Sequence, residues 1–419
     1  MNPALHISSS LWKHCRFLLA ALICIGQCAM VASCVTGSSA SSTSNTVLAG
    51  PVTIERAMAL NKEVLVLHGQ QRFEEALAKA LEALPLWEEL RPPVHEDVAQ
   101  ALINVGMLYK DLEQYEECIQ PLERALEIRR KLRGPLDPEV VLHEETLIYP
   151  YLMIGDVEHG LEYFRAAFNG WYRTLEPNSG DAADKFIGLG DFAIGMYMDH
   201  VDDHAILEEA VVPLQMGLDI RNDLLGPGND KTIRALHALG YVLYVTGEFQ
   251  AAADLFNQYL PPMADALGSD HGQVGATLNK LALCYLDLRD PERCLDATQR
   301  SLPIMESFYG PDHEKVIRSL NLMAEAYMAL GEHERALPLL ERALSICRRL
   351  HADDYWEMQM LRELVAQCES AINSPALAGQ SVTGSGSGSP ASGGETGGAS
   401  VRSRSGAALL MDLGKDKEE

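Results

Sequence analysis

Small residues recur along most of this 419-residue chain at a nearly constant interval of 42 residues. The first series consists of Ala76, Cys118, Gly160, Ala210, Ala252, Cys294 and Ala336. A second series, seven residues later in each unit, consists of Ala83, Ala125, Ala167, Gly217, Tyr259, Ser301 and Ala343. Only the step from Gly160 to Ala210 is longer, at 50 residues. Small side chains are needed where two packed helices approach closely. Seven units in phase therefore predict a stack of helical hairpins.

Larger side chains occupy a third position in most units. They are Leu67, Tyr109, Tyr151, Leu243, Tyr285 and Tyr327. A leucine and a small residue precede them, as in Leu239-Gly240 and Leu281-Ala282. This spacing resembles the tetratricopeptide repeat, in which L-G-x-x-Y and two later small residues span two antiparallel helices. The 42-residue length and loops such as Gly310-Pro311-Asp312-His313 resemble the kinesin light chain version of that repeat.

The resemblance covers residues 53–375 and implies an all-α solenoid of about seven helical hairpins. Trp356–Ile372 is predicted to form one further helix, which would cap the end of the solenoid. In the loops, Gly followed by Pro and Asp predicts the end of one helix and the N-cap of the next. Three units depart from the pattern. The third has Glu144 and Glu145 where other units have leucine and a short polar residue. The fourth has eight extra residues around 196–206, and the first has Glu63 where leucine is expected.

The first 33 residues have the features of an export signal. Lys13 and Arg16 precede an apolar run, residues 17–31, that is shorter than a comfortable membrane span. The run ends in Val31-Ala32-Ser33-Cys34, which resembles the bacterial lipobox and implies acylation of Cys34. An ordinary secretory signal and an uncleaved anchor are the alternatives. Because Val35 rather than Asp follows the cysteine, the resemblance implies the outer membrane of the bacterial envelope, facing the periplasm.

Two further segments differ in composition from the repeats. Residues 34–52 are rich in Ser and Thr and predict a flexible tether, and residues 376–419 form a Gly/Ser-rich tail that is predicted to be disordered. Within that tail, residues 407–413 are apolar again. This short segment is interpreted either as a docking motif or as an inconsequential end.

The charge of the chain argues against one class of partner. Asp and Glu number 59 and Lys and Arg number 34, which gives a formal net charge of −25. Binding to phosphates needs clustered positive charge, so nucleic acid is not expected as a partner. The sequence has no nucleophile elbow, phosphate-binding loop, H-E-x-x-H motif or dinucleotide fingerprint. We therefore expect neither enzymatic activity nor a cofactor.

One short cluster has the spacing of metal ligands. His200 and His204 would share a face of a helix, as zinc ligands can. They are weak candidates, because an acidic insertion is by default a solvated loop. Cys118 and Cys294 occupy the small-residue packing position and are interpreted as core residues. Cys284 and Cys294 share one hairpin, so a disulfide between them is left open.

The binding surface is expected on the first helix of each hairpin, which lines the concave side in proteins of this type. Positions two and six before the large residue of the third series lie at about 160° and 120° from it around a helix, so they are expected to face away from the core. The candidate groove residues are Ile103, Met107, Tyr149, His237, Tyr241, Asn279, Leu283, Asn321 and Glu325. Asn can bond to an extended backbone, and Tyr and Met offer adaptable apolar contact. The alternative is that these residues merely remain on a curved surface.

Together these features favour an envelope-anchored scaffold or adaptor that holds a protein or an extended peptide in its groove, with a lipid anchor as its membrane contact. One alternative is a metal-dependent hydrolase that uses the insertion in the fourth repeat. Another is an oligomerising structural spacer. Metal content would distinguish the hydrolase from the other two, and recovery of a specific partner would distinguish the adaptor from the spacer.

Overall fold

The computed structural model describes residues 52–200, 204–350 and 356–373. These residues form fifteen α-helices and no β-strand. The helices are α2 (Ile54–Gly69), α3 (Phe73–Leu90), α4 (Glu96–Asp111), α5 (Tyr115–Arg133), α6 (Pro138–Met153), α7 (Val157–Thr174), α8 (Gly180–Asp199), α9 (Ala205–Leu225), α10 (Asp230–Val245), α11 (Phe249–Leu267), α12 (Gly272–Asp287), α13 (Pro291–Tyr309), α14 (Glu314–Ala329), α15 (His333–Leu350) and α16 (Trp356–Asn373). The expected signal, most of the tether (residues 34–51) and the expected tail lie outside the described residues.

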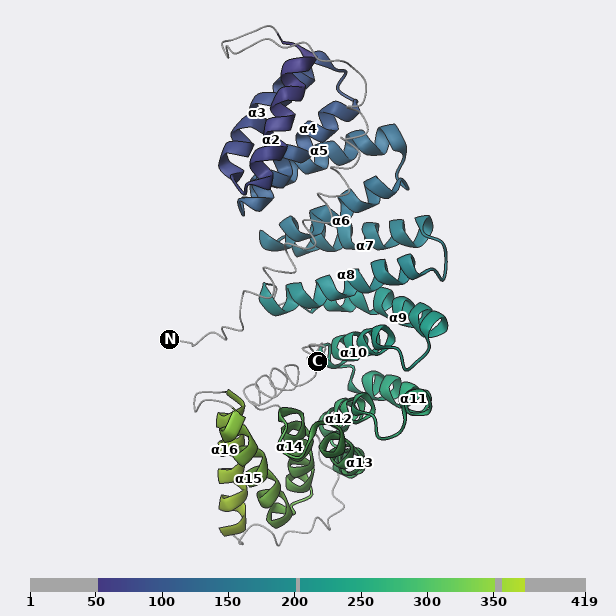
Figure 1. Ribbon diagram of the computed structural model, residues 1–419, viewed down its shortest axis with the longest axis vertical. Coiled ribbons are helices and arrows are strands. Elements are labelled where there is room, and N and C mark those ends of the chain that lie inside the picture. The colour runs from purple at the N-terminus through teal and green to yellow at the C-terminus, as the bar shows by residue number, and fades with distance from the viewer. Residues whose placement is uncertain (1–51, 201–203, 351–355, 374–419) are drawn as a thin grey trace, which may run out of the picture. The chain divides into compact units, whose positions relative to one another are not determined.

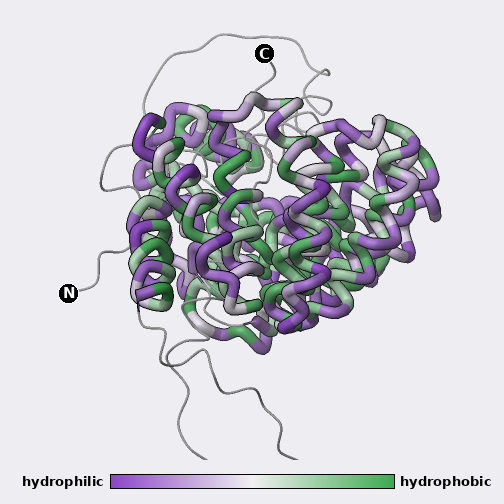
Figure 2. The backbone as a smooth tube through the Cα atoms, turned by 90° about the horizontal axis from the view of Figure 1, so that it is seen from below, coloured by the Kyte–Doolittle hydropathy of each residue, from purple (hydrophilic) through white to green (hydrophobic). Residues whose placement is uncertain are grey.

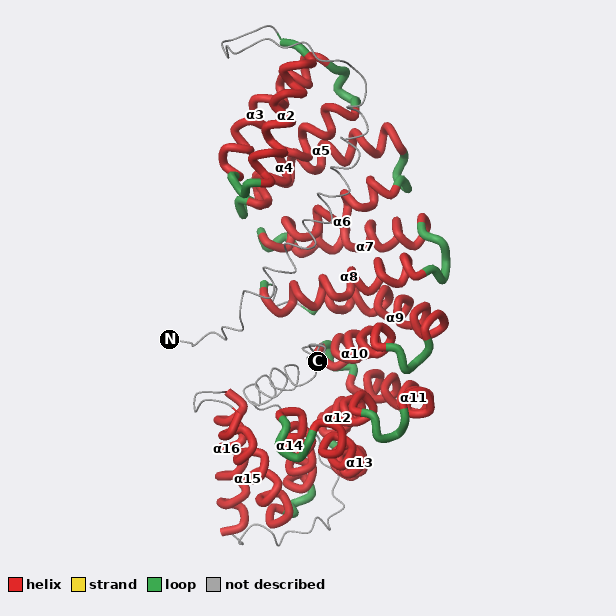
Figure 3. The backbone as a smooth tube through the Cα atoms, viewed as in Figure 1, coloured by secondary structure: helices red, strands yellow, loops and turns green. Residues whose placement is uncertain are grey.

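Consecutive helices pair into hairpins that stack in chain order (Figure 1). The seven hairpins run from α2/α3 to α14/α15, and α16 packs against α15. The connections between helices are short, as Figure 3 shows. The all-α solenoid of seven hairpins and one further helix that the sequence predicts is therefore confirmed.

The two series of small residues are buried, as their spacing predicts. Every member of both series is buried in the structure. Glycine is required at Gly240 of α10, because a Cβ atom there would overlap the ring of Phe256 on α11. Cys118 and Cys294 are fully buried, so their interpretation as core residues is confirmed. Apolar and polar stretches alternate along the helical tube in Figure 2, as expected of helices that bury one face.

The loops between hairpins end one helix and begin the next by local means. Gly134, Gly226, Gly268 and Gly310 have φ angles of 90°, 84°, 98° and 97°, a region that favours glycine and stops a helix. Three residues later, the side chains of Asp137, Asn229, His271 and His313 accept a hydrogen bond from a backbone N–H of the following helix. The predicted sequence of helix end and N-cap is thus confirmed.

Helix α2 shields the amino-terminal end of the stack with charged side chains. Arg56 and Glu63 occupy positions that the next repeat fills with Val98 and Val105, both of which are buried. Arg56 donates to Glu82 at 2.8 Å, and Glu63 forms an ion pair with Lys79 at 3.3 Å. The departure at Glu63 therefore has a structural reason: among the described residues α2 is the first helix of the stack, and a terminal repeat needs a polar outer side.

Within the part of the chain that is described, no helix combines the length and the apolar character needed to cross a membrane.

Candidate binding surface

Most of the predicted groove residues are buried rather than open to a ligand. Met107, Tyr149 and Glu325 are half-buried. The remaining six are buried: Ile103, His237, Tyr241, Asn279, Leu283 and Asn321. Asn279 and Asn321 are only 2% and 1% exposed. The expectation that all these side chains face away from the core is therefore wrong for six of the nine.

Several of these residues are buried because the first helix of a hairpin also packs on the first helix of the next, as α10 does on α12 and α12 on α14. The contact is made between a residue and the one 40 positions later, and it recurs at three junctions. Glu145 accepts from Lys185 at 3.3 Å, His237 pairs with Thr277 at 3.0 Å, and Asn279 donates to Ser319 at 2.8 Å. We call this arrangement the 40-residue pairing.

Buried polar atoms lack a partner where the 40-residue pairing meets an apolar residue. Among the described residues, Asn61 Oδ1, Asn321 Oδ1 and both ring nitrogens of His143 are buried without a hydrogen bond. Their counterparts in the pairing are apolar: Ala101 for Asn61, Leu361 for Asn321 and Ile103 for His143. Burial lowers the pKa of His143 to about 3, so this imidazole is neutral. The pairing therefore explains both the satisfied and the orphaned polar groups along the first helices.

Each first helix also carries a second set of residues on one side of the helix. We call the surface that these residues form the inner face. On α8 these are Asp184, Gly188 and Asp191, and all three are exposed. On α6 the corresponding residues are Leu142, Thr146 and Tyr149, and all are half-buried. Further along, the inner face is more closed. On α10 Ala238 and Tyr241 are buried while Arg234 is exposed, and on α12 Lys280 and Leu283 are buried while Ala276 is half-buried. First helices contact one another directly at several places along the stack: α2 against α4, α8 against α10, α10 against α12 and α12 against α14.

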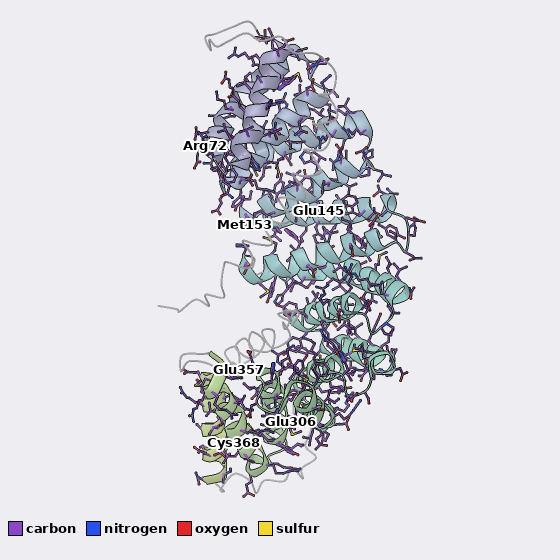
Figure 4. All side chains as sticks on the ribbon, viewed as in Figure 1. Arg72, Glu145, Met153, Glu306, Glu357 and Cys368 are labelled. Atoms are coloured by element: carbon purple, nitrogen blue, oxygen red, sulfur yellow. The ribbon has the colours of Figure 1, made fainter. Side chains whose placement is uncertain are left out.

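An accessible inner face therefore exists in the amino-terminal half of the solenoid, on α4, α6 and α8. On α4 the half-buried Gln100, Asn104 and Met107 belong to it. The labels of Glu145 and Met153 in Figure 4 locate α6, the middle helix of this face. Glu145, on the flank of α6, accepts from the Trp171 indole N–H at 3.0 Å as well as from Lys185, whose ammonium lies 4.3 Å from the Trp171 ring centre. This set of contacts joins α6, α7 and α8.

Asp191 is a functional candidate that the sequence analysis missed. Its side chain is exposed, yet burial raises its pKa to about 6, against the opposing influence of Arg221 and Arg234. The residue was overlooked because Ala193 stands in the fourth repeat where other repeats have Tyr or Leu, so the reference position could not be read there.

Aromatic side chains gather beside this surface. The Tyr149 ring meets Tyr115 edge-on at 5.5 Å and His200 edge-on at 6.3 Å. His204 Nε2 lies 3.0 Å from the hydroxyl of Tyr197. The two weak metal candidates are thus engaged with tyrosines, and among the described residues no three His, Cys, Asp or Glu side chains are grouped to hold a metal ion.

The cysteines of the repeats are free thiols. Cys118, Cys284, Cys294, Cys347 and Cys368 are all buried and unbonded, so Cys284 and Cys294 do not form a disulfide in this structure. Burial raises the pKa of Cys118 and of Cys294 to about 12. Since the thiolate is the reactive form, these two side chains are inert packing groups.

Two shallow recesses lie between consecutive second helices. One, of about 410 Å³, is lined by residues of α11, α12 and α13, and the other, of about 390 Å³, by residues of α3, α4 and α5. They occupy the same place in repeats four hairpins apart, because Leu260, Leu278 and Arg300 of the first correspond to Leu84, Leu102 and Arg124 of the second. Both recesses are thus products of the repeat geometry.

Comparison with known proteins identifies the repeats. The tetratricopeptide repeat model matches residues 55–131 and 273–349. Protein KINESIN LIGHT CHAIN-RELATED 1 of Arabidopsis thaliana is 22% identical over 239 residues, and Protein KINESIN LIGHT CHAIN-RELATED 2 is 24% identical over 189 residues. These matches cover 57% and 45% of this chain and 37% and 27% of the relatives, so the chain spans about a third of their length.

A solved structure with a related fold is that of BtubC (BKLC) from P. vanneervenii. It is 14% identical with a TM-score of 0.31, and the match covers 80% of this chain and 99% of that one. The matched residues are those of α2 to α5 and of α12 to α15, so these four hairpins carry tetratricopeptide repeats. Scaffolds of this class typically mediate protein–protein interaction and are generally not enzymes.

Proposed function

We propose that this chain is an envelope-anchored scaffold that binds a segment of another protein on the inner face of α4, α6 and α8. The observation that carries the proposal is the accessibility of this face, while the equivalent Tyr241, Lys280 and Leu283 further along the solenoid are buried. Tyr149 and Met107, the two half-buried members of the predicted groove in this half, supply amphipathic and adaptable apolar contact. The buried Asn279, Asn321 and Tyr241 have no place in this binding surface.

The test is site-specific photocrosslinking of the full chain in its native cells. A photoreactive amino acid is introduced at Tyr149, at Asp191 or, as the outer control, at Asp254 of α11, which is also exposed. We expect the first two positions to capture the same partner and the third to capture none. Capture of that partner only from Asp254, or equally from all three positions, would contradict the proposal. Capture of copies of this chain alone would instead support the oligomerising spacer.

The membrane contact of this scaffold is proposed to be a lipid on Cys34, with the outer membrane as its site. The lipobox-like Val31-Ala32-Ser33-Cys34 and the short apolar run before it support the proposal. Three acyl chains would give stable anchoring, since two already suffice. Replacing Cys34 by Ser is expected to abolish fatty-acid labelling and to move the protein from the detergent phase to the aqueous phase. Labelling and membrane partition that persist in the variant would refute acylation at this residue.

A further inference from the structure

The inner face of α8 is acidic and has bare backbone at its centre. Gly188 lies between Asp184 and Asp191 on the same side of the helix, four residues from one and three from the other. All three residues are exposed. A Cβ atom built on Gly188 would have no atom within 4 Å, so the missing side chain serves no packing contact. No atom of the described residues therefore fills the space next to Gly188.

The two carboxylates differ in how well the protein compensates their charge. Asp184 accepts a hydrogen bond from Arg221 at 2.8 Å. Asp191 takes part in no hydrogen bond or ion pair among the described residues. Burial raises the pKa of Asp191 to about 6, against the opposing influence of the more distant Arg221 and Arg234. A cation placed next to Asp191 would give this carboxylate the close partner that Asp184 already has in Arg221.

An apolar strip lies one repeat away, on α6. It consists of Leu142, Tyr149 and Met153, which are half-buried and project from the same side of the helix. Contacts of Tyr149 with Tyr115 and His200 hold its ring in place without covering it fully. The strip and the acidic face of α8 are adjacent rungs of one surface, so a ligand that crosses them meets apolar contact first and negative charge second.

We propose that the inner face of α6 and α8 binds a protein segment in which an arginine or lysine is flanked by apolar residues. The cation would lie over Gly188, between the carboxylates of Asp184 and Asp191. The apolar residues would pack on Leu142, Tyr149 and Met153. This inference rests on the proposed function and names the chemistry of the partner.

Charge complementarity favours this occupant over an acidic segment. The chain has a formal net charge of −25. Lys185, the cation of α8 nearest to α6, is occupied by Glu145 and by the Trp171 ring. The exposed Arg234 belongs to α10 and marks the end of the acidic surface. An acidic ligand on α8 would face Asp184 and Asp191 without a free cation between them.

The test is selection of a random displayed library of 12-residue peptides on the full chain. We expect enrichment of sequences in which Arg or Lys stands next to Leu, Ile, Met or Phe. The affinity of an enriched peptide, measured by fluorescence anisotropy, is expected to fall at least tenfold in Asp191→Lys. The matched control Asp254→Lys makes the same charge change on the exposed face of α11 and is expected to leave the affinity within twofold. Circular dichroism verifies that both variants are folded.

The outcomes separate this inference from the proposed function. Enriched peptides that are neutral or acidic, yet are crosslinked from position 149, would overturn the inference and leave the proposed function intact. The same applies to basic peptides that lose no more affinity in Asp191→Lys than in Asp254→Lys. If no peptide is enriched, or if none is crosslinked from position 149 or 191, both the inference and the proposed function fail.

Discussion

The 40-residue pairing predicts that two asparagines at the same repeat position differ sharply in their contribution to stability. Asn279 Nδ2 donates to Ser319 at 2.8 Å, and its Oδ1 accepts from Ser301 at 2.6 Å. Asn321 donates only to Glu325 at 2.8 Å, and its buried Oδ1 has no partner. The chemical difference lies in the following helix, where Asn279 has Ser319 as its counterpart and Asn321 has Leu361.

Replacement by the similarly shaped leucine exposes this difference. Asn279→Leu leaves two buried hydroxyls without their amide partner, and an unsatisfied buried group costs about 1–3 kcal/mol. Ser301 retains its bond to the Gly275 carbonyl at 3.0 Å, and its hydroxyl also lies 3.2 Å from that of Ser319, which compensates in part. We therefore expect a loss of about 2 kcal/mol. Asn321→Leu removes an orphaned acceptor and one hydrogen bond, so its expected loss is below about 0.5 kcal/mol.

Urea unfolding followed by far-UV circular dichroism measures both effects. The midpoint should fall clearly in Asn279→Leu and stay near that of the wild type in Asn321→Leu, with similar m values. Adding Ser301→Ala and Ser319→Ala to Asn279→Leu should recover much of the loss, because replacing all partners by apolar groups is nearly neutral. Equal destabilisation by the two leucine variants would refute the reasoning from the pairing.

Two further predictions concern packing and pH. Ala343 of α15 is fully buried, so Ala343→Leu should overpack the hairpin and lower the free energy of unfolding by about 1–3 kcal/mol, measured by thermal or urea unfolding. The control Ala391→Leu, in the Gly/Ser-rich tail, should leave the free energy of unfolding unchanged. Equal effects of the two substitutions would contradict the repeat register. Glu357 of α16 is buried, and burial raises its pKa from 4.5 to about 7 despite the opposing effect of Arg318. The folded state therefore keeps the Glu357 proton to a higher pH than the unfolded state does. The stability that the protonated carboxyl contributes is fully present below pH 4.5 and is lost as the pH rises through 7. The total loss amounts to at most about 3 kcal/mol. Glu357→Gln should thus gain stability relative to the wild type between pH 5 and pH 8, and a gap that does not change with pH would count against this interpretation.

The fold could be predicted from the sequence because its determinants are local and repeat in phase. Ala125 and Ala343 mark the same close helix approach five repeats apart, and Gly134 and Gly310 end helices in the same way. Each position is supported by its equivalents in the other repeats. The number of hairpins and the additional helix α16 follow from that pattern alone.

The binding surface could not be predicted in the same way. A helical wheel drawn for one hairpin leaves out the first helix of the next, which supplies Ser319 to the buried Asn279. A signal was present in the sequence, since Glu145 and Lys185, like Asn279 and Ser319, are complementary side chains 40 residues apart. The exposed Asp191 required the structure, because the fourth repeat lacks the residue from which the register was read.

The 40-residue pairing has a consequence for how such a chain can be shortened or lengthened. If the hairpin of residues 272–313 were excised, His237 would meet Ser319, a hydroxyl in place of the hydroxyl of Thr277. Excision of the next hairpin, residues 314–355, would instead place Asn279 opposite Leu361 and create another orphaned amide. The modules of this solenoid are therefore alike in backbone but not interchangeable, and the junction side chains restrict which insertions, deletions and permutations of hairpins leave a stable protein.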